Sequence, residues 1–88
     1  MQDNKKQILK NIIGELLKEE RKKKNKSLLM FSYENSISSS ALNYIERGLR
    51  DAQVTTLWKI LEAHNIKMSE FFTQIENTLP DDFKFLED

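Results

Sequence analysis

Apolar residues recur along the chain at helical spacing, and no segment alternates as a strand does. Between Asn4 and Lys24 the apolar positions follow an i, i+1, i+4, i+5 rhythm: Ile8, Leu9, Ile12, Ile13, Leu16 and Leu17. This rhythm predicts one amphipathic helix whose opposite face carries charged residues. Gly14 weakens such a helix by about 0.5–1 kcal/mol relative to alanine, so we expect another helix to pass close to it.

Capping residues and apolar spacing predict four shorter helices in the rest of the chain. Serine at an N-cap accepts hydrogen bonds from the first turn, and glycine just past a helix permits left-handed backbone. Ser27 and Ser38 each precede an apolar-periodic segment, and Gly48 follows the second one. The predicted helices cover residues 28–35, 39–47, 55–65 and 69–77. The predicted fold class is therefore all-α, with five helices in one small domain.

The chain has zero net charge, but its charges are unevenly distributed. Residues 1–50 hold 11 lysines and arginines and 6 acidic residues, whereas residues 51–88 hold 3 and 8. A basic half that faces an anionic partner would explain this asymmetry, and so would ordinary solvated helix surfaces. The absence of cysteine fits a reducing cytoplasm, and no apolar run approaches the roughly 18 residues of a membrane span. We therefore expect a cytoplasmic protein without a membrane segment.

The residue types of catalytic and metal sites occur without the partners that such sites need. His64 is the only histidine, and no second ligand stands at a suitable spacing. The serines at 38–40 have no histidine base within plausible reach. Four carboxylates lie on a tail that offers no scaffold for acid–base chemistry: Asp81, Asp82, Glu87 and Asp88. We expect no enzymatic activity, no metal and no cofactor.

Residues 28–47 predict two short helices joined by a tight corner, a unit with which many proteins enter the major groove of DNA. Four apolar residues at inward positions would fix the angle between the two helices: Phe31, Ile37, Leu42 and Ile45. The outward positions of the second helix are then Ser39, Ser40, Asn43, Tyr44 and Arg47. This outward set predicts a DNA-reading surface.

Neutral side chains can read bases on this surface while cations elsewhere meet the phosphates. Asn43 can pair with adenine, and Tyr44 can pack on a thymine methyl group, which favours A·T-rich sites. Phosphates can be contacted by lysine and arginine side chains and by backbone N–H groups at helix N-termini. The residues that offer these groups are Lys26, Ser27, Ser38, Arg47 and Arg50.

The segment FSYENSISSSALNYIERG, residues 31–48, resembles the helix-turn-helix of the lambda-repressor/Cro/Xre family without a gap. The flanking segments LKEERKKKNKSLL and LRDAQVTTLWKILEAHNIKMSEFF also resemble that family, so the resemblance covers about residues 13–75. It implies a five-helix lambda-repressor-like bundle over residues 13–77. Residues 1–12 then extend the first helix, and residues 78–88 form an acidic tail.

The resemblance also implies roles for individual residues. Those that match base-contact positions are Leu28, Ser39, Ser40 and Tyr44. Those that match phosphate-contact positions are Ser38, Arg47 and the loop after Gly48. Arg21 and Glu46 match an ion pair that ties the first helix to the reading helix. Ser32 and Ser36 replace the family's usual alanine and glycine at the corner, which softens the expectation of strong sequence specificity.

The family resemblance implies a sequence-specific transcriptional regulator, of the repressor or controller type. Such a protein would bind double-stranded DNA as a homodimer at a pseudo-palindromic operator. The alternative is a protein-binding module or antitoxin-like partner built on the same fold, with the acidic carboxyl-terminal half as its docking surface. Strong, salt-dependent retention on DNA separates these two functions.

Apolar residues at the two ends of the chain outnumber what one thin core can bury. The first helix carries Ile8, Leu9, Ile12 and Ile13 ahead of the family-like segment. The far end carries Phe71, Phe72, Ile75, Leu79, Phe83, Phe85 and Leu86. Either the tail folds back onto the amino-terminal extension within one chain, or both are buried across a two-fold axis. We favour the second arrangement and expect Phe71, Phe72 and Ile75 at a homodimer interface.

Overall fold

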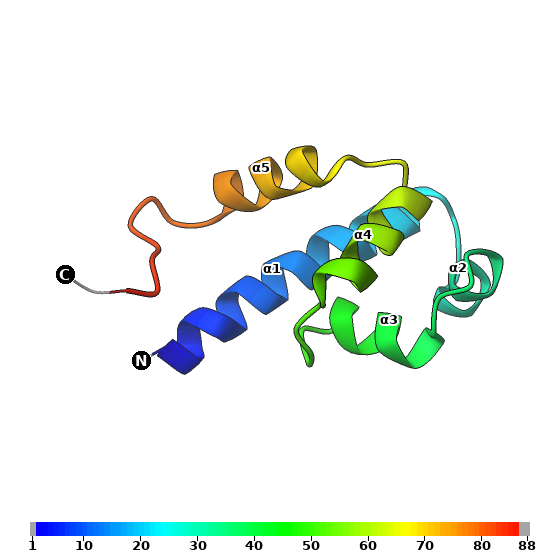
Figure 1. The fold of residues 1–88 in the computed structure, drawn as a ribbon, viewed down its shortest axis with the longest axis horizontal. Helices are drawn as coiled ribbons and strands as arrows, with labels where there is room; N and C mark the ends of the chain where they lie inside the picture. The colour runs from blue at the N-terminus through cyan, green and yellow to red at the C-terminus, as the bar shows by residue number, and fades with distance from the viewer. Residues whose placement is uncertain (1, 87–88) are drawn as a thin grey trace.

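The computed structural model describes residues 2–86, and these residues contain five helices and no strand (Figure 1). The helices are α1 (Gln2–Lys23), α2 (Leu28–Glu34), α3 (Ser39–Glu46), α4 (Val54–Ala63) and α5 (Met68–Thr78). The prediction of an all-α, five-helix fold is confirmed, with α1 beginning two residues earlier than expected. Residue 1 and two acidic residues of the tail, Glu87 and Asp88, lie outside the described residues.

Capping by nearby residues explains where several of the helices begin and end. The Ser27 hydroxyl accepts a hydrogen bond from the Met30 N–H at 3.1 Å, and the Ser38 hydroxyl accepts one from the Ala41 N–H at 3.3 Å. Left-handed residues follow four helices, namely Asn25 after α1, Ser36 after α2, Gly48 after α3 and Asn65 after α4, with φ of 56°, 53°, 71° and 59°. These ends agree with the sequence pattern because each depends on residues close in the chain.

The last two helices each begin one residue earlier than the sequence pattern indicated. Gln53 and Lys67 are their N-cap residues, so Thr55 and Ser69 lie inside the first turn instead of opening it. At α5 the Glu70 carboxylate accepts a hydrogen bond from the Lys67 N–H at 3.4 Å. That bond satisfies the backbone donor of the N-cap residue, which has no partner within the helix.

The core draws apolar side chains from all five helices and from the corner after α2. Its buried members are Leu17, Phe31, Ile37, Leu42, Ile45, Leu57, Ile60, Leu61, Phe71 and Ile75. The four inward positions expected for the two short helices are all among them. Packing of α1 along α3 and along α5 places the longest helix at the centre of the fold, with α3 and α5 on opposite sides of it (Figure 1).

The expected homodimer interface on α5 is wrong at two of its three residues. Phe71 is 0 % exposed and Ile75 is 2 % exposed within a single chain, so neither offers surface to a partner. Residues four apart lie on the same face of a helix, and on α5 this face is the one that packs into the core. Phe72, one position on, points away from the core and is 41 % exposed.

The amino-terminal extension is covered more fully by its own chain than the sequence suggested. Leu9, Ile12 and Ile13 are half-buried against the core, and only Ile8 is exposed. Three of the four apolar residues ahead of the family-like segment are therefore partly covered without a partner chain. Beyond α5, Leu79 also packs on the core, and the Phe83 and Phe85 rings meet edge to face at 5.4 Å. Less apolar surface is left for a partner than the residue count implied.

Candidate nucleic-acid interface

The helix-turn-helix unit is built from α2, the corner at Ser36, and α3. Ser32 is buried between the two helices, and its hydroxyl donates a hydrogen bond to the Leu28 carbonyl at 2.7 Å. The Ile37 N–H donates to the Ser32 carbonyl at 3.0 Å, which closes the corner. From α4, the Lys59 ammonium donates to the Ser36 carbonyl at 2.7 Å. These small and polar contacts fix the angle at which α3 leaves the corner.

Backbone contact with α1 holds the carboxyl-terminal end of α3. A Cβ atom added to Gly14 would lie 2.5 Å from the carbonyl oxygens of both Ile45 and Glu46. Real Cβ contacts are not this short, so glycine is required where the two helices cross. The expectation that another helix passes close to Gly14 agrees with this geometry, and the helix concerned is α3.

A buried ion pair connects the same two helices. Arg21 donates through Nε and Nη2 to the two carboxylate oxygens of Glu46, each at 2.9 Å, and through Nη1 to the Lys26 carbonyl at 2.7 Å. Arg21 is 8 % exposed and Glu46 is 6 % exposed. The hydrogen bond with Glu46 raises the pKa of Arg21 above its usual value. The pair is bidentate and ties α1, the loop after it, and α3 together.

The candidate base-reading residues share the outward face of α3. Ser40 and Tyr44 are exposed, whereas Ser39 and Asn43 are half-buried. The Tyr44 ring lies under the Arg50 guanidinium, with 4.8 Å between the Arg50 Cζ atom and the ring centroid. Such a cation–π contact at an exposed site is worth about 0.5–1 kcal/mol. It places a cation of the following loop beside the reading helix.

The candidate phosphate-binding residues differ in whether their side chains already have partners within the chain. Arg47 and Arg50 are exposed, and the N-cap residues Ser27 and Ser38 lie at the surface with their hydroxyls engaged in capping. Lys26 forms an ion pair with Glu34, at 2.8 Å from Nζ to Oε1. A surface pair of this kind contributes at most about 1 kcal/mol, so a phosphate can compete for Lys26.

Leu28 does not match the base-contact role that the resemblance implied. Its side chain is half-buried and packs against the hydrophobic core. Burial in the core stabilises an apolar side chain at this position. A polar side chain such as glutamine would instead stay at the surface. The exposed residues of α2 are instead Leu29, Met30, Tyr33 and Glu34.

Three polar contacts that support the helix-turn-helix unit were not predicted from the sequence. Glu34 neutralises Lys26, Lys59 bonds the corner, and Gln7 donates to the Gly48 carbonyl at 2.8 Å. Their partners lie 8, 23 and 41 residues away in the chain. No helical periodicity links positions so far apart, so the sequence carries no signal for these contacts.

His64 is a packing residue at the end of α4. It is 3 % exposed and stacks on the Phe31 ring at 4.4 Å between centroids. Neither ring nitrogen has a hydrogen-bond partner among the described residues. Burial, followed by the nearby charge of Lys24, lowers the pKa of His64 to about 4. Across residues 2–86, no group of three or more His, Asp and Glu side chains is placed to hold a metal ion.

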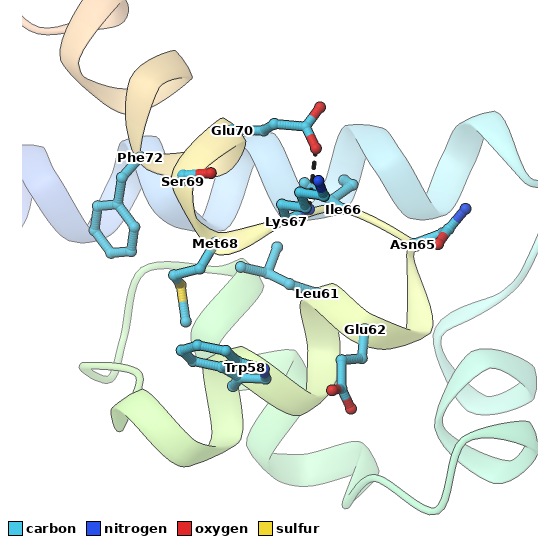
Figure 2. A pocket seen from close by; sticks show the side chains of 10 residues that line it. All are labelled: Trp58, Leu61, Glu62, Asn65, Ile66, Lys67, Met68, Ser69, Glu70 and Phe72. Carbon is cyan, nitrogen blue, oxygen red and sulfur yellow. Dashed lines mark hydrogen bonds between the residues drawn. The ribbon is translucent and has the colours of Figure 1, made fainter.

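An apolar groove lies between α4 and α5, on a different part of the surface from the outward face of α3. It has a volume of about 940 Å³. Figure 2 shows Met68 pointing toward the Trp58 ring, with Phe72 beside them. Trp58 is 52 % exposed and Phe72 is 41 % exposed. Two exposed aromatic side chains at one groove are typical of a protein-contact surface.

Comparison with known protein families places the central unit in a family. A family model described as helix-turn-helix matches residues 17–71, which is more than half of the 88 residues. The matched segment contains α2, the corner, α3 and α4, together with the Arg21–Glu46 pair. No curated protein and no solved structure matches the chain. In the part of the chain that the structure describes, every helix is too short or too polar to span a lipid bilayer.

Proposed function

Because the chain belongs to the Cro/Xre/lambda-repressor-like helix-turn-helix family of DNA-binding regulators, we propose that it regulates transcription in the cytoplasm as a repressor or controller bound to double-stranded DNA. The outward face of α3 carries this proposal. Its polar side chains point away from the core, while Gly14 and the buried Arg21–Glu46 pair hold the helix from behind. A rigid helix with uncommitted polar groups is suited to enter the major groove.

In this proposal the neutral residues of α3 read bases and the cations around it meet phosphates. Ser39, Ser40, Asn43 and Tyr44 are the base-reading residues. Lys26, Ser27, Ser38, Arg47 and Arg50 are the phosphate-binding residues. Phosphate contacts supply most of the affinity and bases supply the specificity. A reading helix without lysine or arginine is therefore compatible with tight binding.

We further propose that two copies associate through the groove between α4 and α5, with Phe72 and Trp58 at the contact. The two reading helices of a dimer must lie about 34 Å apart to enter successive major-groove faces of a pseudo-palindromic site. A two-fold contact through exposed aromatic side chains supports such a fixed spacing. Phe71 and Ile75 take no part, because they are buried in each copy.

A protein-binding module or antitoxin-like partner is the second candidate, favoured by the same exposed aromatic groove. It differs from the first in what it requires of α3. Substitutions on α3 would then leave the function unchanged, and substitutions at Trp58 would abolish it. Binding of the pure protein to duplex DNA at low salt decides between the two candidates.

The test of DNA binding compares substitutions on α3 and the loop with a distant one. Duplexes selected from a random pool are titrated with wild type, Arg47→Ala, Tyr44→Ala and the control Lys84→Ala, and binding is followed by gel shift. Lys84 carries the same charge in the segment after α5, is exposed, and lies outside both the helix-turn-helix unit and the lining of the groove between α4 and α5. Because it removes one phosphate contact, Arg47→Ala should weaken all sequences similarly and reduce the salt slope by about one.

Tyr44→Ala should change which sequences are preferred, since it removes a group that touches bases. Lys84→Ala should behave as wild type. Failure of the wild type to bind any duplex at low salt contradicts the proposal.

A further inference from the structure

The first turns of α1 reach the loop that follows α3. The Gln7 side-chain amide donates to the Gly48 carbonyl oxygen at 2.8 Å and to the Asn11 side-chain oxygen at 2.8 Å. Gln7 and Asn11 both precede residue 17, where the family match begins. This contact is therefore made by a segment that the family model does not cover.

Gly48 is held tightly at this point. Its φ of 71° lies in the left-handed region, and a Cβ atom added to it would collide with the Asn11 side-chain oxygen. The same atom would lie 3.3 Å from the Gln7 side-chain nitrogen. The loop backbone thus packs directly on the polar face of α1, and only glycine fits there.

The loop beyond Gly48 carries Arg50, one of the proposed phosphate contacts. The Leu49 N–H donates to the Tyr44 carbonyl at 2.9 Å, and the Arg50 guanidinium lies over the Tyr44 ring. The backbone from Gly48 to Arg50 is therefore held from two sides. One hold comes from α3 itself and the other from Gln7 on α1. Removal of the Gln7 side chain would break its hydrogen bond to the Gly48 carbonyl and free the loop backbone at that residue. Glycine has more backbone conformations open to it than any other residue, so the gain in disorder there is large.

We propose that Gln7 is a positioning residue for DNA binding: its hydrogen bond to Gly48 fixes the loop so that Arg50 is presented to the phosphates beside α3. This inference rests on the proposed DNA-binding function. Gln7 contacts no DNA in this arrangement and acts through the loop. It is exposed and lies outside the core, so its contribution falls on the loop rather than on the fold.

The variant Gln7→Met tests the role, because methionine keeps the length and helix preference of glutamine but has no donor. Gln74→Met on the exposed face of α5 is the matched control. Dissociation constants for a selected duplex are measured by fluorescence anisotropy over a range of salt. Gln7→Met should bind about three- to tenfold more weakly, the size of one lost hydrogen bond. Its salt slope should equal that of wild type, because Arg50 still neutralises the same phosphate once the loop is ordered on the DNA.

A double-mutant cycle with Arg50→Ala separates positioning from general stability. Once Arg50 is absent, Gln7→Met should cause no further loss of affinity. The melting temperature of Gln7→Met should stay within about 2 °C of wild type, and the Leu49 amide should exchange its hydrogen faster.

Three results would overturn the inference while leaving the proposed function intact. They are equal binding by Gln7→Met and wild type, a full additional loss in the Arg50→Ala background, or a loss of affinity that merely follows a large fall in melting temperature. Absence of DNA binding by the wild type overturns the proposed function, and this inference with it.

Discussion

Lowering the pH from 7 to 5 should weaken the fold through His64. The native protein holds this imidazole 3 % exposed against Phe31, with a pKa lowered to about 4, whereas an unfolded chain titrates near 6.5. Between these two pKa values the unfolded state binds a proton that the native state does not. Stability from this group is therefore fully present above pH 6.5 and is lost as the pH falls toward 4.

The size of the effect follows from the difference between the two pKa values. Each pKa unit corresponds to about 1.4 kcal/mol, so the full loss is about 3 kcal/mol, and about 2 kcal/mol of it falls between pH 7 and pH 5. Small domains are stable by only about 5–15 kcal/mol, so this is a large fraction. Since His64 is the only histidine in the chain, no other imidazole contributes in this range.

Urea unfolding, followed by circular dichroism at several pH values, measures this loss. His64→Leu is the comparison, because leucine is close in size and does not titrate. Carboxylates titrate in both proteins, so the difference between the two pH profiles isolates the imidazole. His64→Leu should lose about 2 kcal/mol less than wild type between pH 7 and pH 5. Parallel profiles would refute the reasoning and show that the imidazole is solvated or paired.

Two further predictions concern the ion pair and the interface. Arg21→Met leaves the buried Glu46 carboxylate without its partner and should lower the free energy of unfolding, measured in urea, by on the order of 3–5 kcal/mol. Lys23→Met removes an exposed pair with Glu20 and should lower it by less than about 1 kcal/mol. An unchanged unfolding midpoint for Arg21→Met would show that the Arg21–Glu46 pair contributes nothing to stability. Light scattering at micromolar concentration should give twice the chain mass of 10.4 kDa, and Phe72→Glu should return the protein to a monomer while Gln74→Glu leaves it dimeric. A wild-type mass near 10.4 kDa is the outcome that rules out the dimer.

The sequence predicted those parts of the fold that depend on neighbouring residues. Ser27, Ser38 and Gly48 mark helix ends because a cap acts over three or four positions, so α2 and α3 were located within one residue. The expectation that Phe71 and Ile75 lie at a dimer interface failed for a different reason. Phe71 and Phe72 are equally apolar, and only the position of α5 against the rest of the fold decides which one faces inward. The spacing of Phe71 and Ile75 shows that both residues lie on one face of the helix. It does not show whether that face packs into the core or lies at the surface.

In the candidate site, too, the residues that depend on near neighbours in the chain were predictable, and those that depend on distant contacts were predictable only in part. The outward set on α3 follows from the inward set, because a helix with Leu42 and Ile45 buried must turn Ser40 and Tyr44 outward. The groups that hold α3 in place were only partly predictable. The Arg21–Glu46 pair was expected from a family pattern, whereas Lys59 at the corner and Gln7 at Gly48 were not. Polar side chains on the solvated face of a helix look alike in sequence, whether or not they reach a distant carbonyl.

The contacts between α1 and α3 show why that polar face matters. Gln7, Gly14 and Arg21 are spaced by seven residues, so they follow one stripe of α1 about two turns apart. Gly14 marks the crossing point with α3, and the other two reach Gly48 and Glu46 from either side. Apolar burial of Leu17 and its neighbours decides that α1 packs here, but burial is non-directional. Hydrogen bonds and close backbone contact are directional, so the polar stripe sets the orientation in which α3 presents its outward face.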